Sequence, residues 1–250
     1  MATDEDHLVA SEIAQSVGHT LAIARVNMIS KGYGALQIMN TGDRLAHHEL
    51  VEELERRFPG DAILSEEASA AERSSSNRLT APRVWIIDPI DGTREFGEGR
   101  TDWAVHVALV ENGQPTAAAV ALPGMDLVFG TAEPPQISPP AEVRRMVVSR
   151  TRPAPEAYML AESLGAVAIP MGSAGAKTMA VVRGEADIYV HSGGQFEWDS
   201  AAPVGVARAA GLWCSRTDGS ELTYNRVDTY LPDLLICHKE DAERILEVIN

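Results

Sequence analysis

The chain has 250 residues, of which 45% are hydrophobic and 23% charged, as expected for a globular protein of one or two domains. Its 36 acidic residues outnumber its 21 basic residues and give a net charge of −15, which argues against a binding surface for nucleic-acid polymers or anionic membranes. No apolar run approaches the ~20 residues that a membrane-spanning helix needs, and the acidic N-terminus predicts a cytoplasmic protein without an export signal.

The first half of the chain predicts two helices followed by a group of strands. Apolar residues recur at helical spacing over 6–31 and 43–58, and Pro59-Gly60 ends the second helix. A short strand over 62–64 leads into Glu66 and Glu67, and a polar surface loop follows at 69–80. Further strands are expected at 83–88, 103–110, 115–122 and 126–131, with the middle two joined by a hairpin turn.

The second half begins after a proline-rich segment at 134–140, which cannot continue a helix or a strand. This segment predicts a boundary between two domains, 1–140 and 141–250. Beyond it helices and strands alternate, a pattern typical of a layered α/β domain. The expected strands are 143–149, 166–170, 186–190, 212–215 and 233–237, and the expected helices are 154–164, 174–183, 200–210 and 239–249.

Two carboxylates end an apolar strand in Trp85-Ile-Ile-Asp-Pro-Ile-Asp-Gly-Thr93. Burying a carboxylate is costly unless a positive group meets it. Pro89 favours an extended Asp88, so Asp88 and Asp91 can point into one space, while Thr93 can cap a helix whose free N–H groups would bind phosphate. Mg²⁺ between the carboxylates would explain the pattern, but a capped turn with solvated aspartates explains these residues equally well.

Two other acidic segments admit a simple explanation when each is taken alone. Glu66 and Glu67 follow a short strand and are typical of an exposed acidic loop. Asp199, in Phe196-Glu-Trp-Asp-Ser-Ala-Ala-Pro203, is interpreted as the N-cap of an alanine-rich helix. Neither segment predicts a metal site by itself.

Taken together, Glu66-Glu67, the Trp85–Thr93 segment and Trp198-Asp-Ser-Ala-Ala202 resemble the inositol monophosphatase superfamily of Mg²⁺-dependent, lithium-sensitive phosphatases. The resemblance spans nearly the whole chain and implies a layered αβαβα sandwich that combines α+β and α/β features. The segments 88–96, 172–177, 193–203 and 230–235 look most like the CysQ-type branch, which acts on 3′-phosphoadenosine 5′-phosphate. Pro203 replaces the glycine that commonly ends the W-D-x-A-A-G motif.

The resemblance also implies a role for each matching residue. The first Mg²⁺ would be held by Glu66, Asp88 and the Ile90 carbonyl, and the second by Asp88, Asp91 and Asp199. Glu66 and Thr93 would orient the attacking water, and the N–H groups of Gly92 and Thr93 would contact the phosphoryl oxygens, which Asp91 and Asp199 also approach through the metal.

Three further residues have two interpretations each. Asp43 is either the N-cap of the 44–58 helix or a group that supports Thr93 or a third Mg²⁺, so the resemblance implies two or three ions. Ser173 is either a helix cap or, with Lys177, part of a site for a second phosphate of the substrate.

The predicted reaction is removal of the 3′-phosphate of 3′-phosphoadenosine 5′-phosphate, or of its sulfated form, by metal-activated water, a step linked to sulfur assimilation. Inositol monophosphatase, fructose-1,6-bisphosphatase or dual activity is the alternative, since the metal ligands are shared. The expected partner is a small phosphorylated substrate, and the resemblance allows a homodimer.

Overall fold

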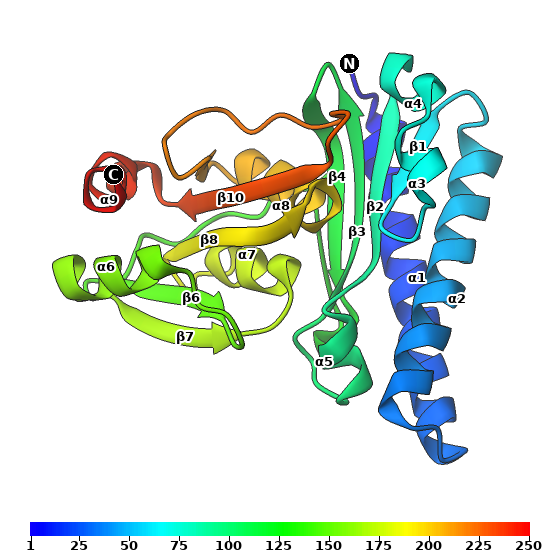
Figure 1. Ribbon diagram of the computed structural model, residues 1–250, viewed down its shortest axis with the longest axis horizontal. Coiled ribbons are helices and arrows are strands. Elements are labelled where there is room, and N and C mark those ends of the chain that lie inside the picture. The colour runs from blue at the N-terminus through cyan, green and yellow to red at the C-terminus, as the bar shows by residue number, and fades with distance from the viewer.

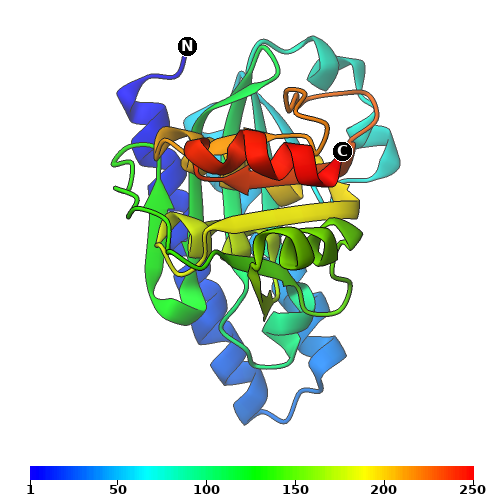
Figure 2. The same cartoon turned by 90° about the vertical axis from the view of Figure 1, so that its left-hand side faces the viewer.

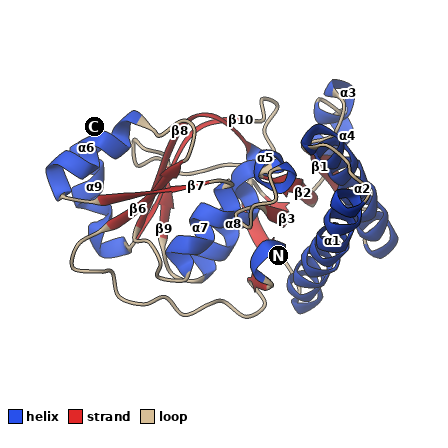
Figure 3. Cartoon of the chain, turned by 90° about the horizontal axis from the view of Figure 1, so that it is seen from below, coloured by secondary structure: helices blue, strands red, loops and turns tan.

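The computed structural model describes residues 1–250 as alternating layers of helices and sheets (Figures 1 and 3). The helices are α1 (Asp4–Ser30), α2 (Ala35–Arg57), α3 (Ala70–Arg73), α4 (Ser76–Thr80), α5 (Thr93–Gly97), α6 (Pro155–Leu164), α7 (Ala174–Val182), α8 (Glu197–Ala209) and α9 (Ala242–Ile249), with short 3-10 helices η1 (Pro123–Met125) and η2 (Lys239–Asp241). None of them combines the length and the apolar composition that crossing a bilayer requires.

The first sheet contains β1 (Ala62–Ser65), β2 (Val84–Asp91), β3 (Ala104–Glu111), β4 (Gln114–Leu122) and β5 (Leu127–Gly130), in that order across the sheet. β1 and β2 are parallel, and the remaining neighbours are antiparallel. Asn112 and Gly113 join β3 to β4 and both adopt positive φ, the conformation that a two-residue hairpin turn requires.

The second sheet contains β6 (Arg145–Ser149), β7 (Val167–Met171), β8 (Ile188–Phe196), β9 (Trp213–Ser215) and β10 (Tyr230–Cys237). Its order is β7-β6-β8-β10-β9, in which β6 is parallel to both of its neighbours and β10 is antiparallel to both of its own. In Figure 2, α9 and α6 lie in front of this sheet and cover its outer face.

Three hydrophobic layers hold the sandwich together. On β2, Trp85 and Ile87 pack toward α1 and α2, whereas Val84 and Ile86 belong to the core on the opposite face of the sheet. That second core includes α7 and α8, which lie between the two sheets, and a third core joins the second sheet to α6 and α9. The run Val84–Ile87 is therefore apolar throughout because β2 is buried on both faces.

Several predicted boundaries differ from those in the structure. α2 begins at Ala35 rather than at residue 43, so Asp43 lies inside the helix and is not its N-cap. The predicted loop at 69–80 contains α3, which Ser69 caps, and α4. β8 continues beyond residue 190 to Phe196 because it pairs along the length of β10, and Gly193 and Gly194 adopt positive φ within it.

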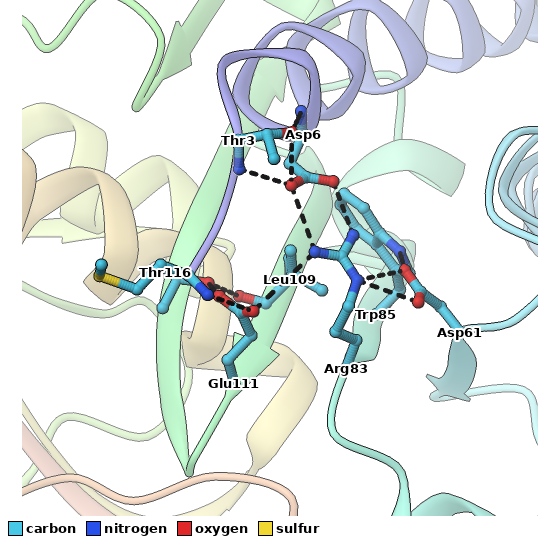
Figure 4. Close-up of polar contacts among 9 residues, drawn as sticks. Thr3, Asp6, Asp61, Arg83, Trp85, Leu109, Glu111 and Thr116 are labelled. Atoms are coloured by element: carbon cyan, nitrogen blue, oxygen red, sulfur yellow. Dashed lines mark hydrogen bonds and ion pairs between the residues drawn. The ribbon is translucent and has the colours of Figure 1, made fainter.

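A buried ion cluster joins the N-terminal end of α1 to the first sheet (Figure 4). The Arg83 guanidinium lies 2.6 Å from an Asp6 oxygen, 3.0 Å from Asp61 and 3.9 Å from Glu111. Asp61 also accepts the indole N–H of Trp85. Burial by itself would raise the pKa of Asp6, but hydrogen bonds from Arg83 and Thr3 hold it below the usual value.

Candidate active site

The carboxylates that the sequence singles out converge between the two sheets. Asp88 and Asp91 come from the end of β2, and Asp199 from the first turn of α8. One oxygen of each lies within 4.8 Å of an oxygen of the other two. Glu66 follows β1, which is parallel to β2, so its side chain reaches the same end of the sheet, where its charge acts on Asp88. These four residues form what we call the carboxylate cluster.

The turn after β2 is shaped by backbone geometry. The pairing of β2 with β3 is irregular between Asp88 and Asp91, which lets both carboxylates leave the strand toward one space. Gly92 has φ 91°, a conformation that disfavours side chains, and a Cβ there would lie 3.2 Å from that of Ser173. α5 then begins at Thr93, whose hydroxyl donates to the Ile90 carbonyl at 3.0 Å.

Asp88 is the most deeply buried member of the carboxylate cluster, with a side chain that is only 1% exposed. One of its oxygens, Oδ1, is buried without any hydrogen-bond partner. Burial, together with the charges of Glu66 and Asp91, raises its pKa well above the usual value. A buried carboxylate oxygen without a donor is costly, so this position calls for a positive ligand.

Asp91 is held on its other side by the second half of the chain. Its Oδ2 accepts hydrogen bonds from the Ser173 hydroxyl at 2.5 Å and from the Gly175 N–H at 2.6 Å. The same oxygen lies 3.2 Å from Nε2 of His106, which is fully buried in β3. Burial alone would raise the pKa of Asp91, but His106, Lys177 and Ser173 lower it, so this residue stays ionised.

His106 was missed as a site residue in the sequence analysis. Its Nδ1 lies 3.0 Å from the Trp198 carbonyl, so the ring joins β3 to the helix that carries Asp199. A polar residue in the otherwise apolar run Ala104–Val110 was the signal that could have identified it. Burial lowers the pKa of His106, but the adjacent Asp91 carboxylate outweighs this effect and raises it.

Asp199 lies one turn inside the position predicted for it. It is the third residue of α8, and its Oδ2 accepts the Phe196 N–H at 2.6 Å, so Phe196 rather than Asp199 is the N-cap. Burial and the charge of Asp91 raise its pKa to about 7. Pro203 is tolerated within α8 without a break in the helix.

Asp43 projects from α2 toward Thr93, with 3.4 Å between Oδ1 and the Thr93 hydroxyl. Burial and the nearby charges of Glu67 and Glu66 raise its pKa to about 7. Of its two predicted roles, the capping role is therefore wrong, and the position beside Thr93 is the one that the geometry supports.

Ser173 and Lys177 both face inward. The Ser173 hydroxyl caps α7 by accepting the Ala176 N–H at 2.9 Å while it donates to Asp91. Lys177 is 4% exposed, and its Nζ donates to the Ser173 carbonyl at 2.6 Å and to the Gly172 carbonyl at 3.3 Å. The position of Lys177 does not offer its ammonium group to a substrate phosphate; it fixes the 172–173 loop and places a positive charge near Asp91.

The carboxylate cluster fits a hard divalent cation such as Mg²⁺. The donors are all carboxylate oxygens, which Mg²⁺ prefers, and Asp88 Oδ1 has no partner among the protein groups. Glu66, Asp88, Asp91 and Asp199 are the side chains that could hold such ions. The Ile90 carbonyl accepts from Thr93 but retains a second lone pair that could also serve.

Withdrawing divalent metal should make stability depend strongly on pH. Asp43 and Asp199 have pKa values of about 7 in the folded metal-free chain, against ~4 in an unfolded chain. The folded state then binds more protons between those pH values, so the free energy of unfolding in EDTA should fall as pH rises through this window. Excess Mg²⁺ should raise the melting temperature by ~5–10 °C at about pH 8 and by much less at about pH 5.

Thermal unfolding monitored by circular dichroism, with and without EDTA, measures this effect. In the Asp199→Asn variant the EDTA curve should be flatter, because one of the carboxylates that titrate in this window is gone. Parallel pH curves with and without Mg²⁺ would show that the carboxylate cluster does not bind the ion.

Comparison with known proteins identifies the family to which this chain belongs. The inositol monophosphatase family matches over residues 4–250. A relative from Mycobacterium leprae named 3′-phosphoadenosine 5′-phosphate phosphatase is 44% identical, covering 98% of this chain and 93% of its own. One of the same name from Mycobacterium bovis is 50% identical, covering 83% of this chain and 80% of its own.

Solved structures support the fold. CysQ from Bacteroides thetaiotaomicron, described as a bacterial member of the inositol monophosphatase family, has a TM-score of 0.80 at 23% identity and covers 94% of this chain and 98% of its own. An inositol monophosphatase from Anabaena has a TM-score of 0.77 at 22% identity, covering 97% and 94% of the two chains. The predicted layered sandwich is thus confirmed, and the chain belongs to the inositol monophosphatase family.

Proposed function

We propose that this protein is a Mg²⁺-dependent phosphomonoester hydrolase that removes the 3′-phosphate of 3′-phosphoadenosine 5′-phosphate, and of its sulfated form, in sulfur assimilation. The observation that carries the chemistry is the carboxylate cluster, with three carboxylate oxygens within 4.8 Å of one another. The substrate is supported by the names of relatives 44–50% identical over most of both chains.

In this proposal the protein binds the phosphate between β2 and α7. Mg²⁺, when bound, would supply Lewis-acid stabilisation of the phosphoryl oxygens and a lowered pKa for the attacking water. Glu66, Asp88, Asp91 and Asp199 hold the ions, and the N–H groups of Gly92 and Thr93 contact the phosphoryl oxygens from the start of α5. The oxygen of water forms a bond to phosphorus and gives up a proton toward Thr93, while the bond from phosphorus to the 3′-oxygen breaks and this oxygen takes a proton from solvent water to leave as a hydroxyl group.

Thr93 and Asp43 form the proton path of the proposed mechanism. The Thr93 hydroxyl lies 3.0 Å from the Ile90 carbonyl and 3.4 Å from Asp43 Oδ1, so it can accept a proton from water while donating its own to the carboxylate. A pKa of about 7 suits Asp43 for taking up and releasing a proton near neutral pH. Glu66 orients the water from the opposite side, at the end of β1.

His106 and Ser173 act on Asp91 rather than on the substrate. Both lie against Asp91 Oδ2, and Ser173 adopts φ 52°, an uncommon value for a residue with a side chain. The contacts to Asp91 and α7 hold Ser173 in this conformation and leave the remaining Asp91 oxygen directed toward the carboxylate cluster.

Substrate preference is the experiment that tests the proposed function. The 3′,5′-bisphosphate nucleotide offers a second phosphate and a base, whereas inositol 1-phosphate offers neither. A charge-assisted contact is worth ~1.5–3 kcal/mol, so kcat/KM for the nucleotide should exceed that for inositol 1-phosphate by at least ~10-fold. Phosphate release should be measured for both substrates and for fructose 1,6-bisphosphate.

The Asp88→Asn variant, purified in parallel, reports contaminating phosphatase and sets the background of this assay. Preference for inositol 1-phosphate would replace the nucleotidase assignment with that of an inositol monophosphatase, which the family match and the similarity to the Anabaena structure favour as the second candidate. Preference for fructose 1,6-bisphosphate would likewise overturn the proposal.

A further inference from the structure

Three aromatic side chains, which we call the aromatic stack, contact one another at the start of α8, next to Asp199. Phe196 and Trp198 lie nearly parallel, with ring centroids 4.9 Å apart and an angle of 11° between the rings. Tyr230 meets Phe196 edge-on at 5.8 Å and 78°. Phe196 and Tyr230 are opposite one another in the pairing of β8 with β10, so their side chains share one face of the second sheet.

This stack is joined to the carboxylate cluster at both ends. The Phe196 N–H donates to Asp199 Oδ2 at 2.6 Å, so the aromatic ring and the carboxylate belong to one hydrogen-bonded turn. On the other side, the Arg73 guanidinium lies 4.7 Å from the Trp198 ring centroid and donates to the Glu66 carbonyl. The aromatic stack therefore has a fixed position relative to two of the four carboxylates.

Phe196 and Tyr230 are partly exposed to solvent, whereas Trp198 is buried. Phe196 is 37% exposed and Tyr230 is 38% exposed, whereas Trp198 is 3% exposed. Trp198 covers one face of Phe196, so the exposed area of Phe196 lies on other parts of its ring. The Tyr230 hydroxyl accepts the Gly194 N–H at 3.2 Å, which holds the second ring in place.

A preorganised, exposed aromatic pair beside a phosphate-hydrolysing site suits a flat, polarisable group of the substrate. We propose that Phe196 and Tyr230 form a stacking site for the purine base of a nucleoside 3′,5′-bisphosphate, an inference that rests on the proposed function. A base attached to the ribose whose 3′-phosphate sits at the carboxylate cluster is held within a few bonds of that phosphate. Base–aromatic stacking is sequence-tolerant and strong, since every base offers a π-face.

The stacking site also accounts for why these rings remain exposed. Burying Phe196 would stabilise the fold through the hydrophobic effect, yet this ring at the end of β8 stays 37% exposed. Inositol 1-phosphate has no aromatic group to place on Phe196. Phe196 and Tyr230 therefore favour a substrate with a base over inositol 1-phosphate, whether or not the protein also contacts the second phosphate.

Equilibrium binding separates this inference from catalysis. Isothermal titration with adenosine 5′-monophosphate and with ribose 5-phosphate, in excess Mg²⁺, compares ligands that differ only in the base. Phe196→Leu and Tyr230→Leu keep an apolar side chain and remove the aromatic face. Each should weaken adenosine 5′-monophosphate by ~5-fold or more and leave ribose 5-phosphate within about twofold.

Tyr158→Leu is the matched control, since Tyr158 is 67% exposed on α6 and should leave both affinities unchanged. Equal weakening of both ligands in Phe196→Leu would show that the ring only supports Asp199, and unchanged binding of both would remove it from recognition. Either result overturns the stacking inference.

Hydrolysis of 3′-phosphoadenosine 5′-phosphate by the unmodified protein tests the proposed function separately. If the protein does not hydrolyse this substrate, the proposed function fails whatever the binding data show. If it does, and the leucine variants do not discriminate between the two ligands, the stacking inference alone fails.

Discussion

Replacing Asp88 by asparagine should lower Mg²⁺-dependent phosphate release by at least ~100-fold while leaving the protein folded. Asp88 is the buried member of the carboxylate cluster, and its Oδ1 has no protein partner. Asparagine has nearly the same shape but lacks the charge that holds a divalent ion. Steady-state phosphate release over a range of Mg²⁺ concentrations measures the loss.

The same substitution should not destabilise the metal-free protein. Glu66, Asp91 and Asp199 all repel a charged Asp88, as the direction of its pKa shift indicates. Removing that charge should therefore hold or raise the melting temperature in EDTA. This outcome separates a ligand role from a role in folding, which would lower both activity and stability.

Glu133→Gln is the matched control for loss of one negative charge, because Glu133 is an exposed residue of the segment that connects β5 to β6. It should change neither measurement. Full activity of Asp88→Asn at saturating Mg²⁺ would exclude Asp88 from the mechanism, and the assignment of the metal site to the end of β2 would fail with it.

Replacing Arg83 by methionine should lower the free energy of unfolding by ~3–5 kcal/mol, the second large effect. Arg83 is the cation shared by three carboxylates whose side chains are 2%, 12% and 9% exposed, namely Asp6, Asp61 and Glu111 (Figure 4). Methionine fills a similar volume but leaves Asp6 and Asp61 without their cation, whereas Glu111 keeps the N-terminal ammonium of Met1 at 3.0 Å. Urea unfolding at neutral pH measures the difference.

The pH dependence of this effect has a definite sign. The pKa of Asp6 is depressed in the folded protein, so its contribution to stability is present above the unfolded value near ~4 and is lost as pH falls through the folded value. The difference between the parent protein and Arg83→Met should therefore shrink in acid. A difference that is constant with pH would show that lost packing, not lost charge, is the cause.

Arg56→Met provides the comparison, because Arg56 forms an ion pair with Glu53 in which the two side chains are 60% and 37% exposed. Water screens such a pair, so this variant should change the free energy of unfolding by less than ~0.5 kcal/mol. If Arg56→Met lowered the free energy of unfolding as much as Arg83→Met, burial would not determine how much an ion pair stabilises this protein.

The sequence by itself determined the layered fold and located the carboxylates of the candidate site. Apolar periodicity gave α1 and the β3–β4 hairpin almost to the residue, because both depend on neighbours in sequence. The run Val84–Ile87 followed by Asp88 indicated a buried strand that ends at a site, and the structure brings Asp88, Asp91 and Asp199 within 4.8 Å of one another. Their roles as metal ligands stay a prediction.

Only the tertiary structure decided which polar groups face the carboxylates. His106 lies 15 residues beyond Asp91 in sequence, yet the pairing of β3 with β2 brings its ring to 3.2 Å from that carboxylate. Ser173 was predicted either to cap a helix or, with Lys177, to bind a second phosphate; it caps α7, and α7 packs between the sheets so that both side chains face inward. Helical spacing gives the neighbours along one helix, not the layer against which it packs.

The aromatic stack shows the same division between sequence and fold. The sequence placed Phe196 and Trp198 beside Asp199, but Tyr230 joins them only because the first residue of β10 pairs with the last residue of β8. Local sequence determines which side chains a segment carries and how its backbone turns. Contacts between segments depend on strand register and layer packing, which are set by burial of apolar surface over the whole chain.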